Sequence, residues 1–389
     1  MNIKEEISIE QIIKWRRYLH EHPEVSFKEV ETAKYIYNEL SKFPNLTLST
    51  PTENSVVAIL KGNNPGKTIA LRADIDALPI VEEADVDFKS KNHGVMHACG
   101  HDTHTAMLLG AVKYLSQIPE KLAGTVKFIF QPAEECPPGG AKTIVEAGII
   151  NDVDFIFGLH IFPRIETGHI GIVNGPLTAS ADIFEINIQG KGSHGSMPEL
   201  SIDPILTGVE IINNLNNIVS RNISPMDNAV ISIGQFVSGE VHNIIPDTAD
   251  IKGTVRANNH KTRLFLKKRI EEVVDHVCKM YGANYNLEYN LGYSSIINDI
   301  EAADIIRNSA KKIVGEQKIF ISPQIMVGED FSAYTEVTKG AFFILGGGSN
   351  EKGYKYINHN PNFIIDEKAL KIGSSMHVQI VLDTIGMGI

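Results

Sequence analysis

The chain has 389 residues, of which 43% are hydrophobic and 21% charged, and its formal net charge is −11 at pH 7. This length exceeds the size at which a single hydrophobic core stops growing, so we expect a globular protein of two domains. The acidic balance leaves no basic stripe to meet a phosphate backbone, which argues against nucleic acid as a partner.

The expected compartment is the cytoplasm. Cys99, Cys136 and Cys278 are too few to form a disulfide framework, and such sparse use of cysteine suits a reducing environment. The first ten residues carry charges and lack the apolar core of a secretory signal. No apolar run approaches the length needed to cross a bilayer, so no membrane partner is expected.

Predicted elements in the first part of the chain alternate between helix and strand, which is typical of a parallel sheet with crossover helices. In chain order they are helices over about 9–19 and 27–40, strands at 55–60 and 68–71, a helix over about 103–116, a strand at 126–130, a helix from about 141 and a strand at 155–159. In such sheets, functional groups gather just beyond the carboxyl ends of the strands. Asp74 and Asp76, Glu134 and Glu135, and His160 follow three separate predicted strands.

A second domain is predicted to be inserted over residues 177–292. Its elements are a strand at 182–189, a helix over about 203–219, strands at 229–236 and 249–256, a helix over about 261–280 and a strand at 284–289. They predict a smaller α+β domain with a four-stranded sheet and two helices. Residues 1–176 and 293–389 would then form one α/β domain, with a mainly parallel sheet and helices on both faces.

The most informative stretch is residues 96–104, which read MHACGHDTH. Thiolate, imidazole and carboxylate groups bind zinc, and the same set suits nickel, cobalt and manganese. So many candidate ligands in one short loop indicate a metal site. The alternative is a polar loop that caps the following helix through Asp102 or Thr103.

Two further motifs have a functional and a structural interpretation. Alternation places Asp74 and Asp76 on the same side of a strand end, where burial is costly without a positive partner. Either a metal site or Arg72 alone would provide one. Glu134 and Glu135 suit metal binding and proton transfer, but an acidic pair is also favoured at a helix N-terminus.

The candidate ligands number five, namely Cys99, His101, Glu135, His160 and His359. Five protein ligands are too many for one open catalytic metal site and about right for two metals with a shared ligand. Such a centre lowers the pKa of water and polarises a carbonyl group. Glu134 would then take the proton of the water and pass it to the leaving nitrogen.

Three stretches resemble the hallmarks of the M20 metallopeptidases, and more narrowly of their amidohydrolase branch, which includes aminoacylases, hippurate hydrolase, auxin-conjugate hydrolases and N-acetyldiaminopimelate deacetylase. They are RADIDALP at 72–79, MHACGHDTH at 96–104 and QPAEE at 131–135. Further motifs at 190–195, 242–246, 328–331 and 359–363 extend the resemblance over nearly the whole chain.

This resemblance implies two divalent metals on Cys99, His101, Glu135, His160 and His359, with Glu134 as general base and acid. Zn, Mn, Ni and Co all remain open, although the cysteine favours softer ions. Other branches of the superfamily have a histidine and an aspartate where this chain has Asp74 and Asp76. The resemblance therefore implies that Asp76 orients the base or a ligand, and that Asp74 is not a ligand.

The resemblance also gives expectations for the inserted domain, as a lid that often supplies the dimer interface. His194 is expected near the substrate, where it helps to hold the scissile carbonyl. Asn243 and Arg256 are candidates for contacts with a substrate carboxylate, because arginine grips a carboxylate through two hydrogen bonds. An ordinary surface arginine on a strand is the alternative for Arg256.

The sequence thus predicts a metal-dependent hydrolase that cleaves the amide bond of an N-acyl amino acid or a related small conjugate. A dipeptidase or exopeptidase of the same superfamily is the alternative among enzymes. A non-catalytic metal-binding protein is the alternative of another class. A homodimer or a higher homo-oligomer through the inserted domain is expected.

Overall fold

The computed structural model describes residues 3–387, and their contacts divide the chain into two compact units. The first unit contains residues 1–177, 296–323 and 329–389, and the second contains residues 178–295 and 324–328. The sequence places residues 324–328 in the catalytic domain, whereas in the structure they pack with the second unit. In residues 3–387, none of the helices combines the length and the apolar character that spanning a bilayer requires.

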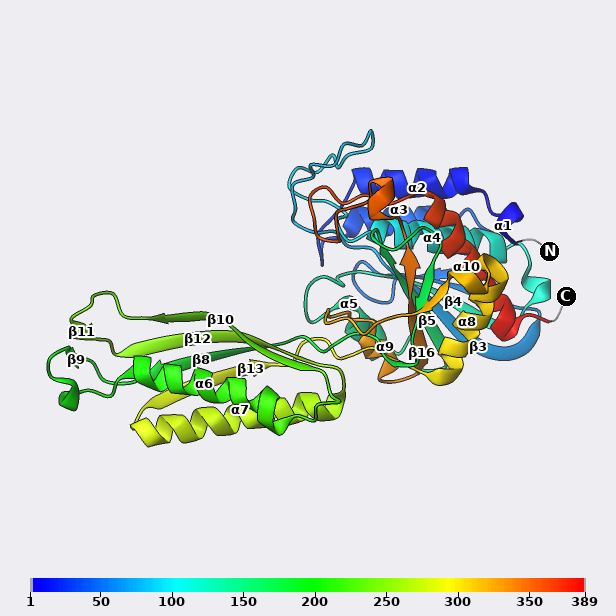
Figure 1. Ribbon diagram of the computed structural model, residues 1–389. Coiled ribbons are helices and arrows are strands. Elements are labelled where there is room, and N and C mark those ends of the chain that lie inside the picture. Colours follow the sequence, from blue (N-terminus) through cyan, green and yellow to red (C-terminus); the bar gives the residue numbers. More distant parts are fainter. Residues whose placement is uncertain (1–2, 388–389) are drawn as a thin grey trace. The chain divides into compact units, whose positions relative to one another are not determined.

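An eight-stranded sheet forms the centre of the first unit (Figure 1). Its strands, in spatial order, are β1 (Leu46–Ser49), β2 (Val56–Lys61), β4 (Ala123–Gln131), β3 (Asn64–Asp74), β5 (Phe155–Phe162), β16 (Lys339–Gly346), β6 (Ile170–Ile172) and β15 (Ile319–Ile321). The four central strands, β4, β3, β5 and β16, are parallel to one another, so their carboxyl ends lie at one edge. The pairs β1–β2, β2–β4 and β16–β6 are antiparallel.

Helices cover both faces of this sheet (Figure 1), because its central strands are apolar on both sides. On β5, Phe157 and Leu159 enter one core, and Ile156 enters the core on the opposite face. Alternating side chains along a strand point to opposite faces, so each such strand serves two cores. The expectation of a mainly parallel sheet in an α/β protein is confirmed.

The larger of these two cores receives side chains from α1 (Ile3–Glu6), α2 (Ile9–Glu21), α3 (Val30–Leu40), α4 (His101–Leu115), α8 (Ile300–Val314) and α10 (Lys368–Ile385). The core on the other face receives them from α5 (Gly140–Glu146) and α9 (Ser332–Thr335). Short strands β7 (Gly175–Pro176) and β14 (Ile297–Asn298) pair with each other. Three 3-10 turns, η1 (Pro119–Lys121), η3 (Glu316–Lys318) and η4 (Asn350–Lys352), complete this unit.

The second unit is an antiparallel four-stranded sheet with two helices on one face (Figure 1). Its strand order is β10 (Ala229–Ser238), β12 (Thr248–Ala257), β8 (Asp182–Gln189) and β13 (Asn284–Asn290), and its helices are α6 (Pro204–Asn222) and α7 (His260–Tyr281). Along β8, Phe184, Ile186 and Ile188 are buried under these helices, and the residues between them are more exposed. A two-stranded antiparallel sheet of β9 (Ser193–His194) and β11 (Ile244–Ile245), and the turn η2 (Pro198–Leu200), also belong to this unit.

Two element boundaries differ from the prediction in ways that matter for the site. The strand expected to end before His160 continues to Phe162, so His160 lies inside β5. The helix expected from about residue 103 begins at His101, which is therefore a residue of the first turn of α4. β5 is longer because its residues 160–162 still pair with β16, and α4 begins earlier because the N–H groups of Thr103 and His104 donate to Gly100 O.

Candidate metal centre

Cys99 lies at the centre of a cluster of possible ligands in the first unit. Its Sγ is 3.3 Å from His160 Nε2 and 3.3 Å from His359 Nε2. The same His359 nitrogen is 3.1 Å from Glu135 Oε1. Cys99 is buried, whereas 52% of the His359 side chain is exposed, so the cluster is open to solvent on the His359 side.

His101 joins this cluster from the first turn of α4. Its Nε2 lies 3.8 Å from Glu135 Oε1 and 3.9 Å from Glu134 Oε2. Its Nδ1 is 3.1 Å from Asp76 Oδ1, so a proton on Nδ1 donates to Asp76 and leaves the Nε2 lone pair facing the two glutamates. This carboxylate–imidazole pair is the usual support of a metal-binding histidine.

Two buried atoms of the cluster lack a hydrogen-bond partner within residues 3–387, namely His101 Nε2 and Glu135 Oε1. Buried polar atoms are almost always satisfied, so an unsatisfied pair facing each other fits a site that binds a metal ion. Three overlapping groups have their ligand atoms within 4.8 Å of one another: Cys99 with His101 and His160, Cys99 with Glu135 and His359, and His101 with Glu134 and Glu135. Cys99, His101 and Glu135 each belong to two of these groups, which fits two adjacent metal ions that share ligands. The thiolate, imidazole and carboxylate donors fit a soft or borderline divalent metal.

Tight backbone turns bring these side chains together. Gly100, between Cys99 and His101, has φ +91°, and a Cβ there would lie 2.7 Å from Ile161 Cγ2. Ala133, one residue before Glu134, has φ +54°. His359 itself has φ +67°, and its N–H donates to Ala98 O at 2.8 Å, which ties the late histidine to the metal loop. L-residues rarely adopt this conformation, so the surrounding structure has to hold them in it.

The electrostatics of the cluster favour a bound cation. Burial raises the pKa of the Glu134 carboxyl well above its usual range, and the charges of Glu329 and Glu135 raise it further. Burial and the same Glu135 raise the pKa of the Cys99 thiol. Burial by itself would lower the pKa of His101, but Asp74 and Asp76 raise it to about 10. A divalent cation would offset the excess of negative charge and compete with these protons.

Asp74 has a different role from Asp76. It accepts a hydrogen bond from Arg72 Nη1 at 2.7 Å and lies 2.6 Å from His104 Nδ1. Arg72 Nη2 also donates to Asp330 Oδ1 at 2.7 Å and lies 3.2 Å from Glu329 Oε1. The structural interpretation of an Asp–Arg cluster therefore describes Asp74, whereas Asp76 contacts the candidate metal cluster.

Two residues that the sequence did not single out support the cluster. His104 Nε2 accepts a hydrogen bond from Ile161 N at 3.0 Å, so its Nδ1 is the nitrogen that donates to Asp74. Asn358 Nδ2 donates to Cys99 O at 3.1 Å and to Ile161 O at 3.3 Å. His104 stands in the metal motif and Asn358 precedes His359, but no residue pattern distinguishes a supporting partner from a ligand.

The predicted substrate contacts lie in the second unit. His194 and Asn243 are neighbours beside the paired strands β9 and β11, because Gly195, which follows His194, donates its N–H to Asn243 O at 2.8 Å. His194 Nδ1 is 2.8 Å from Ser196 Oγ. Arg256 lies on β12, where its Nη1 donates to Val255 O at 3.0 Å. His194 and Asn243 thus lie together, whereas Arg256 lies on a different strand of this unit.

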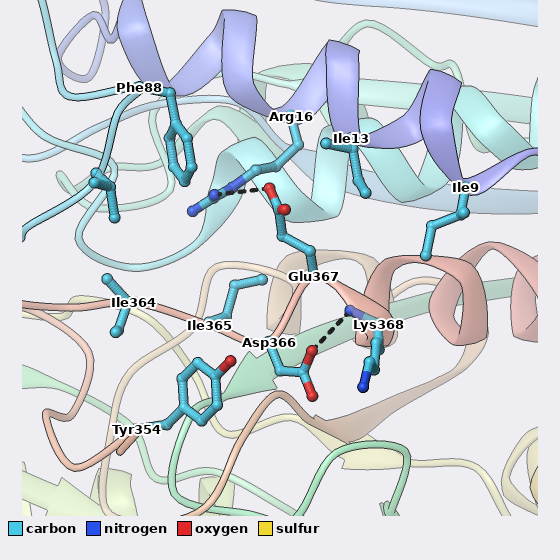
Figure 2. A pocket seen from close by; sticks show the side chains of 11 residues that line it. Ile9, Ile13, Arg16, Phe88, Tyr354, Ile364, Ile365, Asp366, Glu367 and Lys368 are labelled. Atoms are coloured by element: carbon cyan, nitrogen blue, oxygen red, sulfur yellow. Dashed lines mark hydrogen bonds and ion pairs between the residues drawn. The ribbon is translucent and has the colours of Figure 1, made fainter. Parts of the chain in front are cut away.

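A cavity of about 460 Å³ lies apart from the cluster, where α2 packs beside the start of α10 (Figure 2). In the view of Figure 2, Phe88 stands over the Arg16 guanidinium, whose carbon is 4.5 Å from the ring centre. Arg16 Nη1 donates to Glu367 Oε1 at 3.4 Å, and its Nε donates to Asp102 Oδ2 at 2.8 Å. Asp102 therefore holds α2 against the helix that starts with His101.

Comparison with known proteins agrees with this geometry. The sequence pattern of peptidase family M20/M25/M40 matches residues 70–383. The chain belongs to this family. It is 47% identical over 287 residues to an N-acyl-L-amino acid amidohydrolase of Geobacillus stearothermophilus, covering 74% of this chain and 78% of that protein. It is 40% identical over 375 residues to thermostable carboxypeptidase 2 of Saccharolobus solfataricus, covering 95% and 94%.

A solved structure of an M20 family member shows the same architecture. A Bacillus subtilis protein described as a dinuclear metal-binding peptidase superimposes on this chain with a TM-score of 0.84 and 37% sequence identity. The alignment covers 96% of this chain and 97% of that chain. The predicted resemblance to the M20 family is confirmed.

The buried Arg72 cluster generates a prediction about stability. Arg72→Met leaves Asp74, Glu329 and Asp330 buried without their cation, so the free energy of unfolding should fall by about 3–5 kcal/mol. Chemical denaturation followed by circular dichroism measures it. The matched control is Arg17→Met, which breaks an ion pair whose arginine is 45% exposed and should change stability by about 1 kcal/mol or less. Equal losses in the two variants would contradict the assignment of Arg72.

Proposed function

We propose that this M20 family member is a metal-dependent amidohydrolase that cleaves the amide bond of N-acyl amino acids or related small conjugates. The observation that carries the proposal is the convergence of Cys99, His101, Glu135, His160 and His359, with Glu134 beside them. The expected cofactors are two divalent metal ions on these five residues. The name of the Geobacillus relative supports the reaction, and the description of the Bacillus structure supports the metal count.

In the proposed mechanism, the metals and the carboxylate of Glu134 have separate roles. Metals held by Cys99, His101, Glu135, His160 and His359 would polarise the scissile carbonyl and lower the pKa of water. Glu134 Oε2 takes the proton of the attacking water, holds it, and delivers it to the departing nitrogen. Its burial and its acidic neighbours suit this role, since they raise the affinity of the carboxylate for a proton. Asp76 orients His101 through the hydrogen bond to Nδ1.

An exopeptidase activity is the second candidate, because one relative is named a carboxypeptidase. Both reactions cleave an amide bond next to a free carboxylate, so the same metal chemistry serves both. In either case we propose that His194, Asn243 and Arg256 of the second unit contact the substrate. A panel of acetyl, benzoyl and longer acyl amino acids beside dipeptides, assayed with the metal-loaded protein, separates the two activities by their relative kcat/KM.

We further propose that the second unit is the lid domain and the site of homodimerisation, and that the first unit is the catalytic domain. β10 is an edge strand of the four-stranded sheet, and exposed edge strands offer unpaired backbone groups to another chain. Phe236 and Val237 on this strand are exposed. The three cysteines are free, which supports the cytoplasm as the compartment.

Replacement of the proposed base tests the reaction. Glu134→Gln keeps the shape of the side chain but cannot accept and return a proton, so kcat for an acetyl amino acid should fall by about 10²–10⁴-fold. Metal content, measured by inductively coupled plasma mass spectrometry, should remain at the wild-type value. Cys136→Ala, at an exposed position two residues away, is the control and should keep full activity. Unchanged hydrolysis in Glu134→Gln would contradict Glu134 as the base, and no hydrolysis by the wild type would favour a non-catalytic metal-binding protein.

Removal of the metal tests the cofactor. The wild-type protein should bind close to two ions per chain, lose activity in a chelator, and regain it when divalent metal is added back. His359→Ala removes a ligand candidate that contacts both Cys99 and Glu135, so it should bind fewer ions after the same reconstitution. His276→Ala, on the exposed surface of α7, is the control. A stoichiometry of one ion in the wild type, or none, would contradict the two-metal site.

Interruption of the exposed edge tests the dimer. Val237→Lys places a charge on an edge strand at a residue that is 51% exposed, so it should shift a homodimer towards the monomer. Light scattering coupled to size-exclusion chromatography measures the mass. The control is Val81→Lys in the first unit, at a residue that is 53% exposed, which should leave the mass unchanged. A wild-type protein that elutes as a monomer would refute dimerisation.

A further inference from the structure

Glu29 occupies an unusual position at the start of α3. It is the N-cap residue of this helix and is 0% exposed, yet within residues 3–387 its side chain caps no N–H of the helix. The capping is done by Glu24, whose carboxylate accepts from Thr32 N at 2.8 Å and from Glu31 N at 3.3 Å. Burial of a carboxylate is costly, so a group that does not serve its own helix requires another explanation.

The Glu29 carboxylate is directed to a segment more than one hundred residues away in the chain. Its Oε1 accepts a hydrogen bond from Ala133 N at 2.7 Å, and its Oε2 is 3.4 Å from Asn54 Nδ2. Ala133 is buried and has φ +54°. This conformation is disfavoured for alanine, so the hydrogen bond holds a strained residue directly before Glu134.

The turn that carries Glu134 is therefore held on both sides by carboxylates. Glu29 accepts from the N–H of Ala133, and Asp76 Oδ2 accepts from the N–H of Glu135 at 2.9 Å. Ser26, three residues before Glu29, donates to that same Asp76 oxygen at 2.7 Å. The chain from Ser26 to Glu29 thus supports the turn directly at Ala133, through Glu29, and indirectly at Glu135, through Asp76.

We propose that Glu29 is a positioning residue, which holds the backbone at residues 133–135 so that Glu134 and Glu135 face His101. This inference rests on the proposed function, in which Glu134 moves the proton and Glu135 binds metal. The role requires a hydrogen-bond acceptor at this place and does not require a charge. Burial raises the pKa of the Glu29 carboxyl to about 7, and its oxygen accepts from Ala133 N in either protonation state.

Three variants test the role. Glu29→Ala removes the acceptor, so kcat should fall by about tenfold or more while KM changes by less than about threefold. Metal affinity, measured by competition with a chromogenic chelator in the absence of substrate, should weaken by about tenfold because Glu135 lies on the same turn. Glu29→Gln keeps an acceptor oxygen, and Asn54 can turn its amide to match, so both quantities should return to within about threefold of wild type.

Glu24→Ala is the matched control, because it removes hydrogen bonds at the N-terminus of the same helix without contact to Ala133. It should lower the melting temperature like Glu29→Ala but leave kcat and metal affinity unchanged. Wild-type kcat and affinity in Glu29→Ala, an equal loss in Glu29→Gln, or an equal loss in Glu24→Ala would each overturn the proposal. If the wild-type protein hydrolysed no acyl amino acid, the proposed function would fail, and the comparison of metal affinities would still decide the role of Glu29.

Discussion

Buried negative charge at the carboxyl ends of the central strands is the constraint on which the rest of this structure depends. Asp74, Asp76 and Glu134 are nearly inaccessible to solvent, and ionised carboxylates in such surroundings need compensating cations. Arg72 compensates one part of this charge, through Asp74 and Asp330. The other part surrounds His101, and there we assign the compensation to divalent metals. The carboxyl edge of the sheet thus contains one permanent cation, the Arg72 guanidinium, and a proposed site for exchangeable metal ions.

Geometry of this kind depends on backbone conformations that are unfavourable in isolation. Ala133 and His359 have positive φ, which strains an L-residue, whereas Gly100 adopts positive φ freely, and each of the three is a ligand candidate or lies within two residues of one. The sharp turns allow side chains from the turn after β4, the start of α4, β5 and the loop before α10 to point at one small volume. Each strained residue has a specific support, such as Ala98 O for His359 and the Glu29 carboxylate for Ala133. Contacts in the rest of the fold therefore offset the strain of these residues and keep the ligand candidates in one arrangement.

Membership of the M20 family and the geometry lead to the same function by independent routes. The family assignment follows from similarity along the chain, whereas the metal assignment follows from unsatisfied buried atoms and from distances. Cysteine in the cluster distinguishes it chemically from sites made of carboxylates and imidazoles alone. The protein around the cluster contributes orientation, as in the contact between Asp76 and His101.

The sequence by itself determined the α/β alternation, the strands and helices of the second unit and the candidate ligands, because hydrophobic period and residue chemistry are local properties. Asp74 and Asp76, which alternation places on the same side of a strand end, show the limit of inference from a local pattern. The period of two applies only while a strand continues, and β3 ends at Asp74, so Asp74 accepts from Arg72 whereas Asp76 does not, although both aspartates lie within 4 Å of His101. Only the tertiary structure decided that Asp74 binds Arg72, that His104 and Asn358 support the cluster, and that Glu29 contacts Ala133. Each of these contacts joins separate turns of the fold or depends on where a strand ends, and no local pattern in the sequence records such a distance.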